Sequence, residues 1–133
     1  MTTDLTCLLL LALWSIPLNH IPALGRVASA GTEEGLKWAA SNRDTAIATP
    51  PWVGRADRAQ RNHHDNLAMI AAVILIAHIT QQADPITAKA AIAILVFRIL
   101  HAVFYYVGIG IVRSLSYVGS IVGLAVIVWR ILT

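Results

Sequence analysis

The sequence predicts an all-α integral membrane protein, a four-helix bundle forming a single domain over residues 1–133. Three observations support this prediction. Of the 133 residues, 57% are hydrophobic and 13% are charged, whereas a soluble domain is about 45–50% apolar and about 25% charged. Four segments reach the length that a spanning helix needs. The Lys and Arg residues gather in alternate loops, as they do in multi-pass membrane proteins.

The first spanning segment is predicted at residues 5–24, which corresponds to about 30 Å of helix. Pro17 and Pro22 predict a kink in its second half. The small residues 28–30 resemble a signal-peptide cleavage site, which is the alternative interpretation of this segment. The residues before the apolar run include Asp4 and neither Lys nor Arg, so we expect the segment to be retained as a spanning helix.

The other three spanning segments are predicted at residues 62–81, 86–107 and 114–132. Asp84 precedes a proline and is therefore disfavoured in a helix, so a turn separates the second and third spans. Two glycines around residue 109 separate the third span from the fourth.

Two shorter features complete the expected fold. The loop over residues 25–57 contains Gly35–Ser41, which we expect to form a short interfacial helix anchored by Trp38. In the last span, Gly119 and Gly123 form a Gly-x-x-x-Gly pair, which allows another helix to approach closely.

The loop charges predict the orientation of the chain. The turn between the second and third spans has no Lys or Arg, whereas the link before the fourth span ends in Arg113. The positive-inside rule therefore places the first and third loops in the cytoplasm and both termini on the opposite side. The first loop carries most of the basic residues: Arg26, Lys37, Arg43, Arg55, Arg58 and Arg61.

This topology brings three polar stripes to one depth near the cytoplasmic face. Residues three or four positions apart share a helix face, and ionisable residues inside a membrane mark functional sites by default. The second span contributes Arg58, Arg61, Asn62 and Asp65, the third Arg98, His101 and Tyr105, and the fourth Arg113, Ser114 and Tyr117.

Simpler interpretations remain open for single residues. Arg58 and Arg113 also fit cytoplasmic anchors, and the tyrosines also fit interfacial side chains. Arg98 lies about two turns inside its span, so it must reach the interface or find a partner, for which Asp65 is the first candidate. Because arginines outnumber the carboxylate, we expect a bound anion to balance the charge.

Glutathione suits this balance, because it has two carboxylates, an amine and a thiol whose ionised form arginines favour. The second substrate would be a lipophilic small molecule that arrives from the lipid bilayer. The residues are compatible with glutathione but do not require it.

Other chemistries find less support in the sequence. No metal site is predicted, because the adjacent His63 and His64 point about 100° apart on a helix and no HExxH motif or Cys/His cluster is present. No nucleic-acid partner is predicted, because the basic residues form no patch with interleaved aromatics. Cys7 is the only cysteine, so no intramolecular disulfide is possible.

Three segments together resemble the MAPEG family, the membrane-associated proteins of eicosanoid and glutathione metabolism. They are Arg58–Leu67, Phe97–His101 with Tyr105, and Val112–Tyr117. The resemblance implies a homotrimer of four-helix subunits, with glutathione as co-substrate bound between neighbouring subunits near the cytoplasmic face. A trimer is also expected because Arg98 and Asp65 need more burial than one thin bundle offers.

The resemblance also implies roles for the stripe residues. Arg61, Asn62 and Asp65 would contact glutathione with Arg58 beside them, and Arg98, His101 and Tyr105 would line the same pocket. Arg113 matches an arginine that stabilises the thiolate, Ser114 a serine proposed to assist catalysis, and Tyr117 a pocket tyrosine. The sequence departs from the family in two ways: the usual Glu is Asp65, and no proline follows it.

The leading interpretation is a membrane glutathione transferase-like or peroxidase-like enzyme acting on lipophilic electrophiles. One alternative is a non-catalytic MAPEG-like protein with a structural or anion-binding role. Another is a small transporter or channel component that uses Arg98 and Asp65 as a relay.

Overall fold

The computed structural model describes residues 1–133 and contains five helices and no strand, which confirms the all-α prediction. Three of the helices, α1, α4 and α5, are long and apolar enough to cross a membrane. The second predicted span, residues 62–81, falls in the later part of α3 except for its last two residues. Helix α3 is long enough to cross a membrane, but its first half carries the polar stripe. The helices are α1 Thr3–Ala30, α2 Thr32–Ala40, α3 Pro51–Ile79, α4 Pro85–Val107 and α5 Gly110–Leu132.

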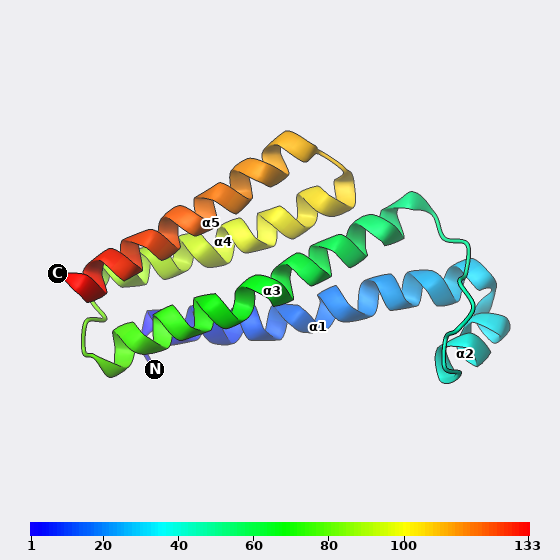
Figure 1. Cartoon of the computed structure of the whole chain (residues 1–133), viewed down its shortest axis with the longest axis horizontal. Helices are drawn as coiled ribbons and strands as arrows, with labels where there is room; N and C mark the ends of the chain where they lie inside the picture. Colours follow the sequence, from blue (N-terminus) through cyan, green and yellow to red (C-terminus); the bar gives the residue numbers. More distant parts are fainter.

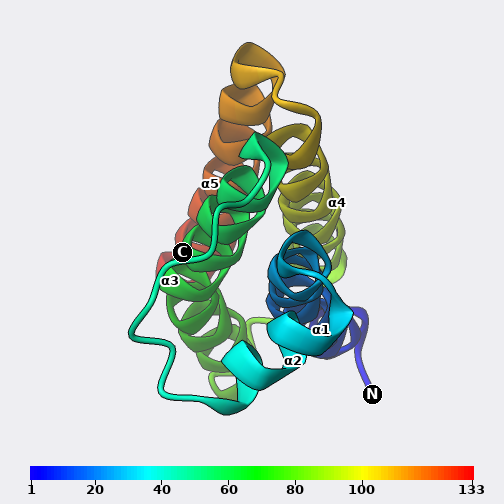
Figure 2. The same ribbon diagram turned by 90° about the vertical axis from the view of Figure 1, so that its right-hand side faces the viewer.

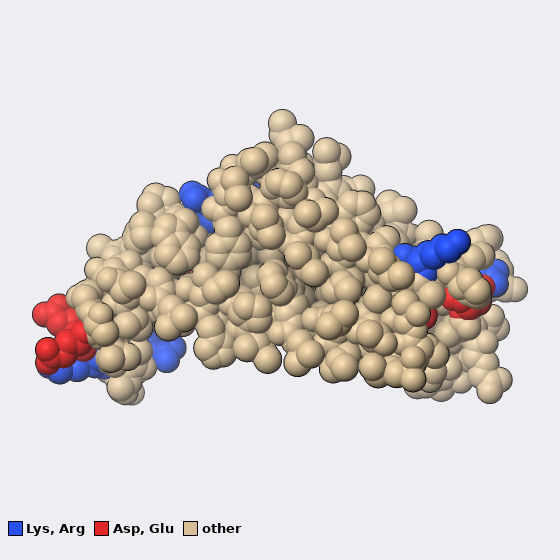
Figure 3. Space-filling view, turned by 180° about the vertical axis from the view of Figure 1, so that it is seen from behind, with Lys and Arg blue, Asp and Glu red and all other residues tan.

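The four long helices run alongside one another and α2 lies at one end (Figures 1 and 2). Both termini and the α3–α4 turn lie at the opposite end, as the predicted topology requires (Figure 1). Seen from behind, the charged side chains gather at the two ends and most of the surface between them is uncharged (Figure 3). This distribution is typical of a protein whose middle lies in lipid.

Helix α1 is longer than the predicted span, because it continues past residue 24 to Ala30 and runs through both of its prolines. Gly31 ends it with φ of 84°, a conformation that glycine adopts without strain. The chain then folds back, and α2 crosses α1 where a side chain on Gly35 would clash with the Val27 backbone. The expected short helix is thus present over Thr32–Ala40, three residues before its predicted start at Gly35.

Helix α3 begins at Pro51, well before the predicted start at residue 62. Proline is favoured in the first turn of a helix because its fixed φ is already helical and its missing N–H has no partner there. The added turns are fastened to α1 by an ion pair between Arg26 and Asp57 and by a hydrogen bond from Gln60 to Asn19 at 2.7 Å.

The apolar core occupies the half of the bundle that is nearer the termini. Cys7 and Leu11 of α1 pack there with Ile74 of α3, Ile94 of α4 and Ile127 of α5, all buried. The other half buries polar side chains, among them His63, Arg98 and His101. Buried ionisable side chains in a membrane protein mark functional sites by default, so the polar half of the bundle is the candidate location of such a site.

The α4–α5 hairpin depends on the two glycines of the Gly-x-x-x-Gly pair. A Cβ on Gly119 would lie 2.8 Å from the Phe97 ring, and one on Gly123 would lie 2.8 Å from Cγ1 of Ile94. Both distances are shorter than van der Waals contact, so larger residues would push the helices apart. The expected close helix approach is confirmed.

Asp84 joins the start of α4 to the end of α5. Its Oδ1 accepts hydrogen bonds from the N–H groups of Ile86 and Thr87 at 2.8 and 2.9 Å, and the Thr87 hydroxyl accepts one from the Asp84 N–H at 2.9 Å. Its Oδ2 accepts two more from the Arg130 guanidinium at 3.0 and 2.7 Å. This capping box explains why the turn ends sharply at Pro85.

We expect the contribution of Asp84 to stability to disappear in acid. The Thr87 N–H, together with Arg130, holds the pKa of this carboxyl below its ordinary value of 3.8. A lowered pKa means that the stabilisation is complete above the unfolded value and is lost as pH falls through the folded one. The melting temperature of the wild type should therefore exceed that of Asp84→Asn at neutral pH, and the difference should shrink below pH 3.8.

Asp44→Asn is the matched control, because Asp44 is exposed in the loop after α2. Its melting temperature should follow that of the wild type at every pH. A constant difference between wild type and Asp84→Asn across the acid range would contradict the assignment.

Candidate functional site

Arg98 is the most deeply buried ionisable side chain of the polar half, with 1% of its surface exposed. Its Nη1 donates to Oδ1 of Asn62 at 3.0 Å and its Nη2 donates to the Asn62 carbonyl at 2.9 Å. The predicted pairing of Arg98 with Asp65 is therefore wrong. Asp65 lies on the outward face of α3 and is exposed, whereas Asn62 faces α4 and offers both oxygens to one guanidinium.

His101 lies one turn further along α4 and connects it to the start of α5. Its Nδ1 lies 2.8 Å from the Arg113 carbonyl, to which only a protonated nitrogen can donate. In the neutral ring Nε2 is then a hydrogen-bond acceptor, and it is buried with no partner in the protein. The ring centroid lies 5.0 Å from that of Tyr105 and 5.7 Å from that of Tyr117.

Arg113 stands in the first turn of α5 with its guanidinium unpaired. The guanidinium carbon lies 4.8 Å from the centre of the Tyr105 ring, a cation–π arrangement. The ion pairs of the molecule involve other residues, so its N–H donors are free for a ligand. The positive N-terminal end of α5 adds to the charge at this point.

A pocket of about 260 Å³ collects the side chains of three helices beside Arg113. It contains six of the ten predicted site residues, which therefore do lie together as the three-stripe hypothesis expects. Its lining is Asn62, His101, Tyr105, Arg113, Ser114, Tyr117 and Val118.

Two further recesses meet this pocket at Arg113. One, of about 70 Å³, is lined by Arg55, Arg58 and Tyr105 among others, and is strongly basic. The other, of about 450 Å³, is lined by Ser114 together with the apolar residues Ile111, Leu115 and Val118. A basic recess and an apolar recess thus share one arginine, an arrangement that suits a polar anion on one side and a lipophilic molecule on the other.

A family model connects this geometry with known proteins: the model of the MAPEG family matches residues 5–133. The chain belongs to the MAPEG family. No curated protein matches it significantly. Membership in this family and three candidate spanning helices make the chain a multi-pass membrane protein, and they associate it with the glutathione and eicosanoid chemistry of its family.

The recesses at Arg113 in this MAPEG chain exclude three residues that the resemblance assigns to the glutathione site: Arg61, Asp65 and Arg98, the last of which is buried against Asn62. Arg61 and Asp65 are exposed and line none of the three recesses at Arg113. They lie on the outward face of α3 with Arg58, which reaches the basic recess. Within one subunit the predicted stripe of α3 is therefore divided, with Asn62 turned inward and the charged residues turned outward.

Arg55 belongs to the site, although its place in the sequence suggests only a loop charge. Its Nε donates to the Tyr106 carbonyl at 3.2 Å, and the side chain packs over Gly108, where a Cβ would lie 3.4 Å from that nitrogen. Arg55 precedes Arg58 by three positions and so continues the same helical stripe. The prolines at 50 and 51 obscured this signal by suggesting a loop.

The adjacent histidines of α3 point in different directions in this MAPEG chain, as their spacing predicts. Nε2 of His63 is buried, 3.1 Å from both the Leu11 carbonyl and the Ser15 hydroxyl of α1. His64 is exposed and its Nδ1 donates to the Gln60 carbonyl at 2.9 Å. His63 therefore fastens α3 to α1.

Proposed function

We propose that this MAPEG protein is a membrane glutathione transferase-like enzyme. It would join the glutathione thiolate to a lipophilic electrophile or use it to reduce a peroxide. The observation that carries the proposal is the unpaired Arg113 guanidinium, which lies where a basic recess, a polar pocket and an apolar recess meet. Such a junction suits a reaction between a water-soluble anion and a membrane-dissolved partner.

The residues around Arg113 fit the chemistry of glutathione. Arg55 and Arg58 in the basic recess match its carboxylates, and Asn62, held by Arg98, offers a fixed amide to its peptide groups. The free Nε2 of His101 is an acceptor for an N–H or thiol group. With the thiol at Arg113, the guanidinium and the start of α5 both favour the ionised sulfur.

Arg113 is the main catalytic group in this proposal and Ser114 is secondary. The Ser114 hydroxyl donates its hydrogen to the Gly110 carbonyl at 3.0 Å, so it must leave that bond before it donates to a thiolate. The Arg113 guanidinium has no bond to break. The electrophile would approach along the apolar recess formed by Ile111, Leu115 and Val118.

The experiment for this function is turnover of glutathione with a chlorinated nitroarene by the purified protein in detergent. We expect product formation that depends on both protein and thiol. Calorimetric titration with glutathione distinguishes the non-catalytic alternative, which predicts binding without turnover. Absence of both binding and turnover would contradict the proposal.

We further propose that α3 also crosses the membrane, as the second of four spans, and that the protein is a homotrimer with its site facing the cytoplasm. The outward face of α3 supports this, because Arg58, Arg61 and Asp65 are exposed on it and charged side chains avoid lipid. Contact with a neighbouring subunit would shield them. Arg98 does not support the trimer as expected, because a single subunit already buries it.

The topology is tested by labelling single cysteines introduced at Ser41 and Gln82 in a Cys7→Ala background. We expect the two positions to react from opposite sides of the membrane, with Ser41 on the cytoplasmic side. Labelling of both from one side would contradict the four-span arrangement. A monomeric mass in detergent at micromolar concentration would contradict the trimer.

A further inference from the structure

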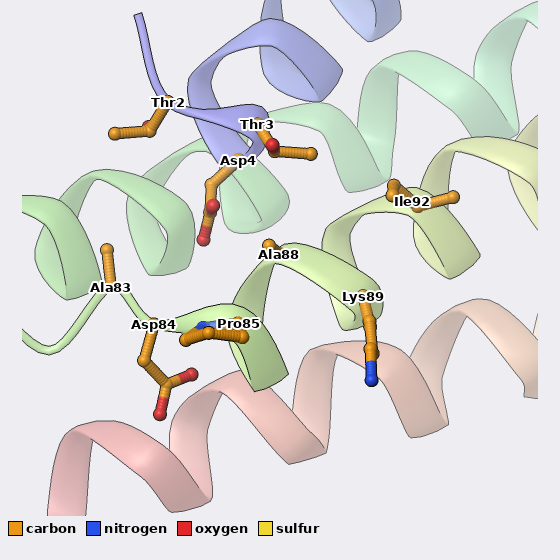
Figure 4. A pocket seen from close by; sticks show the side chains of 9 residues that line it. All are labelled: Thr2, Thr3, Asp4, Ala83, Asp84, Pro85, Ala88, Lys89 and Ile92. Atoms are coloured by element: carbon orange, nitrogen blue, oxygen red, sulfur yellow. The ribbon is translucent and has the colours of Figure 1, made fainter.

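A second pocket, of about 590 Å³, lies at the end of the molecule that carries both termini. Its walls are the beginning of α1 and the beginning of α4 (Figure 4). Thr2, Thr3 and Asp4 come from the first, and Asp84, Ala88 and Lys89 from the second. The pocket lies at the membrane face opposite Arg113, so it plays no part in the proposed transferase site.

Asp4 is an unpaired carboxylate in this pocket. The residue is only 4% exposed, yet it takes part in none of the ion pairs of the molecule and in no side-chain hydrogen bond. Figure 4 shows its carboxylate pointing toward the α3–α4 turn, while the Lys89 ammonium points away from it, toward α5. The carboxylate oxygens stay open to the pocket, and their unused acceptor sites favour a ligand that brings N–H donors and positive charge.

The neighbouring carboxylate of Asp84 is not available in the same way. Both of its oxygens already accept hydrogen bonds, from the first turn of α4 and from Arg130. Asp4 is therefore the acceptor that the pocket leaves free. The hydroxyls of Thr2 and Thr3 lie on the same wall.

Lys89 lies on the ridge of α4 between this pocket and an apolar groove of about 480 Å³. The groove runs between α4 and α5 and is lined by Ile86, Phe97, Val122 and Val126 among others. Lys89 is exposed and has no ion-pair partner. Three features therefore follow one another across α4: the polar pocket with the Asp4 carboxylate, the Lys89 ammonium and the apolar groove.

We propose that this end of the molecule binds a phospholipid whose headgroup carries a primary amine. Its ammonium contacts Asp4, its phosphate contacts Lys89, and one acyl chain lies in the α4–α5 groove. Each part matches its site: a primary ammonium has three N–H donors for a carboxylate, lysine binds phosphate as a point charge, and the groove offers almost only apolar side chains. A choline headgroup has no N–H donor, so Asp4 discriminates against it.

The experiment is native mass spectrometry of the whole protein in detergent, titrated with ethanolamine, choline and glycerol phospholipids of equal chain length. A charge-assisted hydrogen bond is worth about 1.5–3 kcal/mol, so we expect the wild type to prefer the ethanolamine lipid over the choline lipid by about tenfold or more. Asp4→Asn should remove this preference. Lys89→Gln should weaken both lipids alike, and Lys89→Arg should retain them.

Exposed residues of the same types serve as controls: Asp44→Asn and Lys37→Gln should behave as the wild type. Equal affinity of the wild type for the ethanolamine and choline lipids would overturn the proposal without any variant. Tighter binding of the anionic glycerol lipid than of the ethanolamine lipid would also overturn it, because Lys89 alone would then define the site. Retention of the preference in Asp4→Asn would do the same.

Discussion

Replacing Arg113 by alanine is expected to lower turnover with glutathione by about 100- to 1,000-fold, because it removes a donor placed where negative charge develops on the sulfur. The unpaired guanidinium stays charged at any physiological pH, so it stabilises an anion without giving up a proton. Glutathione binding should weaken far less, because Arg113 acts on charge that appears when the thiol ionises. Lysine should restore only part of the rate, because it offers a point charge and no planar fork.

The measurement is the ultraviolet absorbance of the bound thiolate, followed together with affinity and turnover. Arg61→Ala is the comparison, because it is expected to weaken binding mainly and to leave the thiolate signal of saturated protein intact. Since Arg61 is exposed in one subunit, that loss of binding also requires a neighbouring subunit at the site. A full thiolate signal and normal turnover in Arg113→Ala would rule out the assignment.

Replacing Arg98 by alanine is expected to cost about 3 kcal/mol of stability, because hydrogen bonds from a charged group are worth about 1.5–3 kcal/mol each. Its two bonds to Asn62 would be lost and a cavity would remain in the bundle. Arg98→Met fills most of that volume and should recover part of the stability. Neither variant holds the Asn62 amide, so both should bind glutathione more weakly.

Thermal unfolding in detergent and calorimetry with glutathione measure the two effects of Arg98 separately. Lys37→Ala is the matched control for stability, and we expect a change within about 0.5 kcal/mol because that side chain is exposed and makes only a surface ion pair with Glu33. If Arg98 acts on glutathione through Asn62, adding Asn62→Ala to Arg98→Met should weaken binding no further. Fully additive losses would mean that the two residues act independently.

The sequence was informative about the site because the stripes of α4 and α5 are regular and lie on unbroken helices. His101, Tyr105, Arg113 and Tyr117 lie together in the structure because their spacing and the short α4–α5 link leave few alternatives. The Gly-x-x-x-Gly pair was predictable for the same reason, since it follows helical spacing within one element.

The prediction that failed, the pairing of Arg98 with Asp65, depends on a feature that helical periodicity does not determine. Charge suggested Asp65 as the partner of Arg98, but the rotation of α3 about its axis placed Asn62 there. That rotation depends on packing against α1, including the His63 contacts, which join residues far apart in sequence. Likewise, Asp4 and Lys89 are far apart in the chain, and only the fold brings them to one pocket.

The bond between Arg98 and Asn62 also has a consequence for the way the chain enters a membrane. An arginine near the centre of an isolated helix costs about 2.5–3.5 kcal/mol on insertion, and α4 carries one in an otherwise apolar stretch. Because α3 precedes α4 in the chain, Asn62 has already been synthesised when Arg98 leaves the ribosome. If α3 spans the membrane as proposed, we therefore expect α3 and α4 to enter it as a pair.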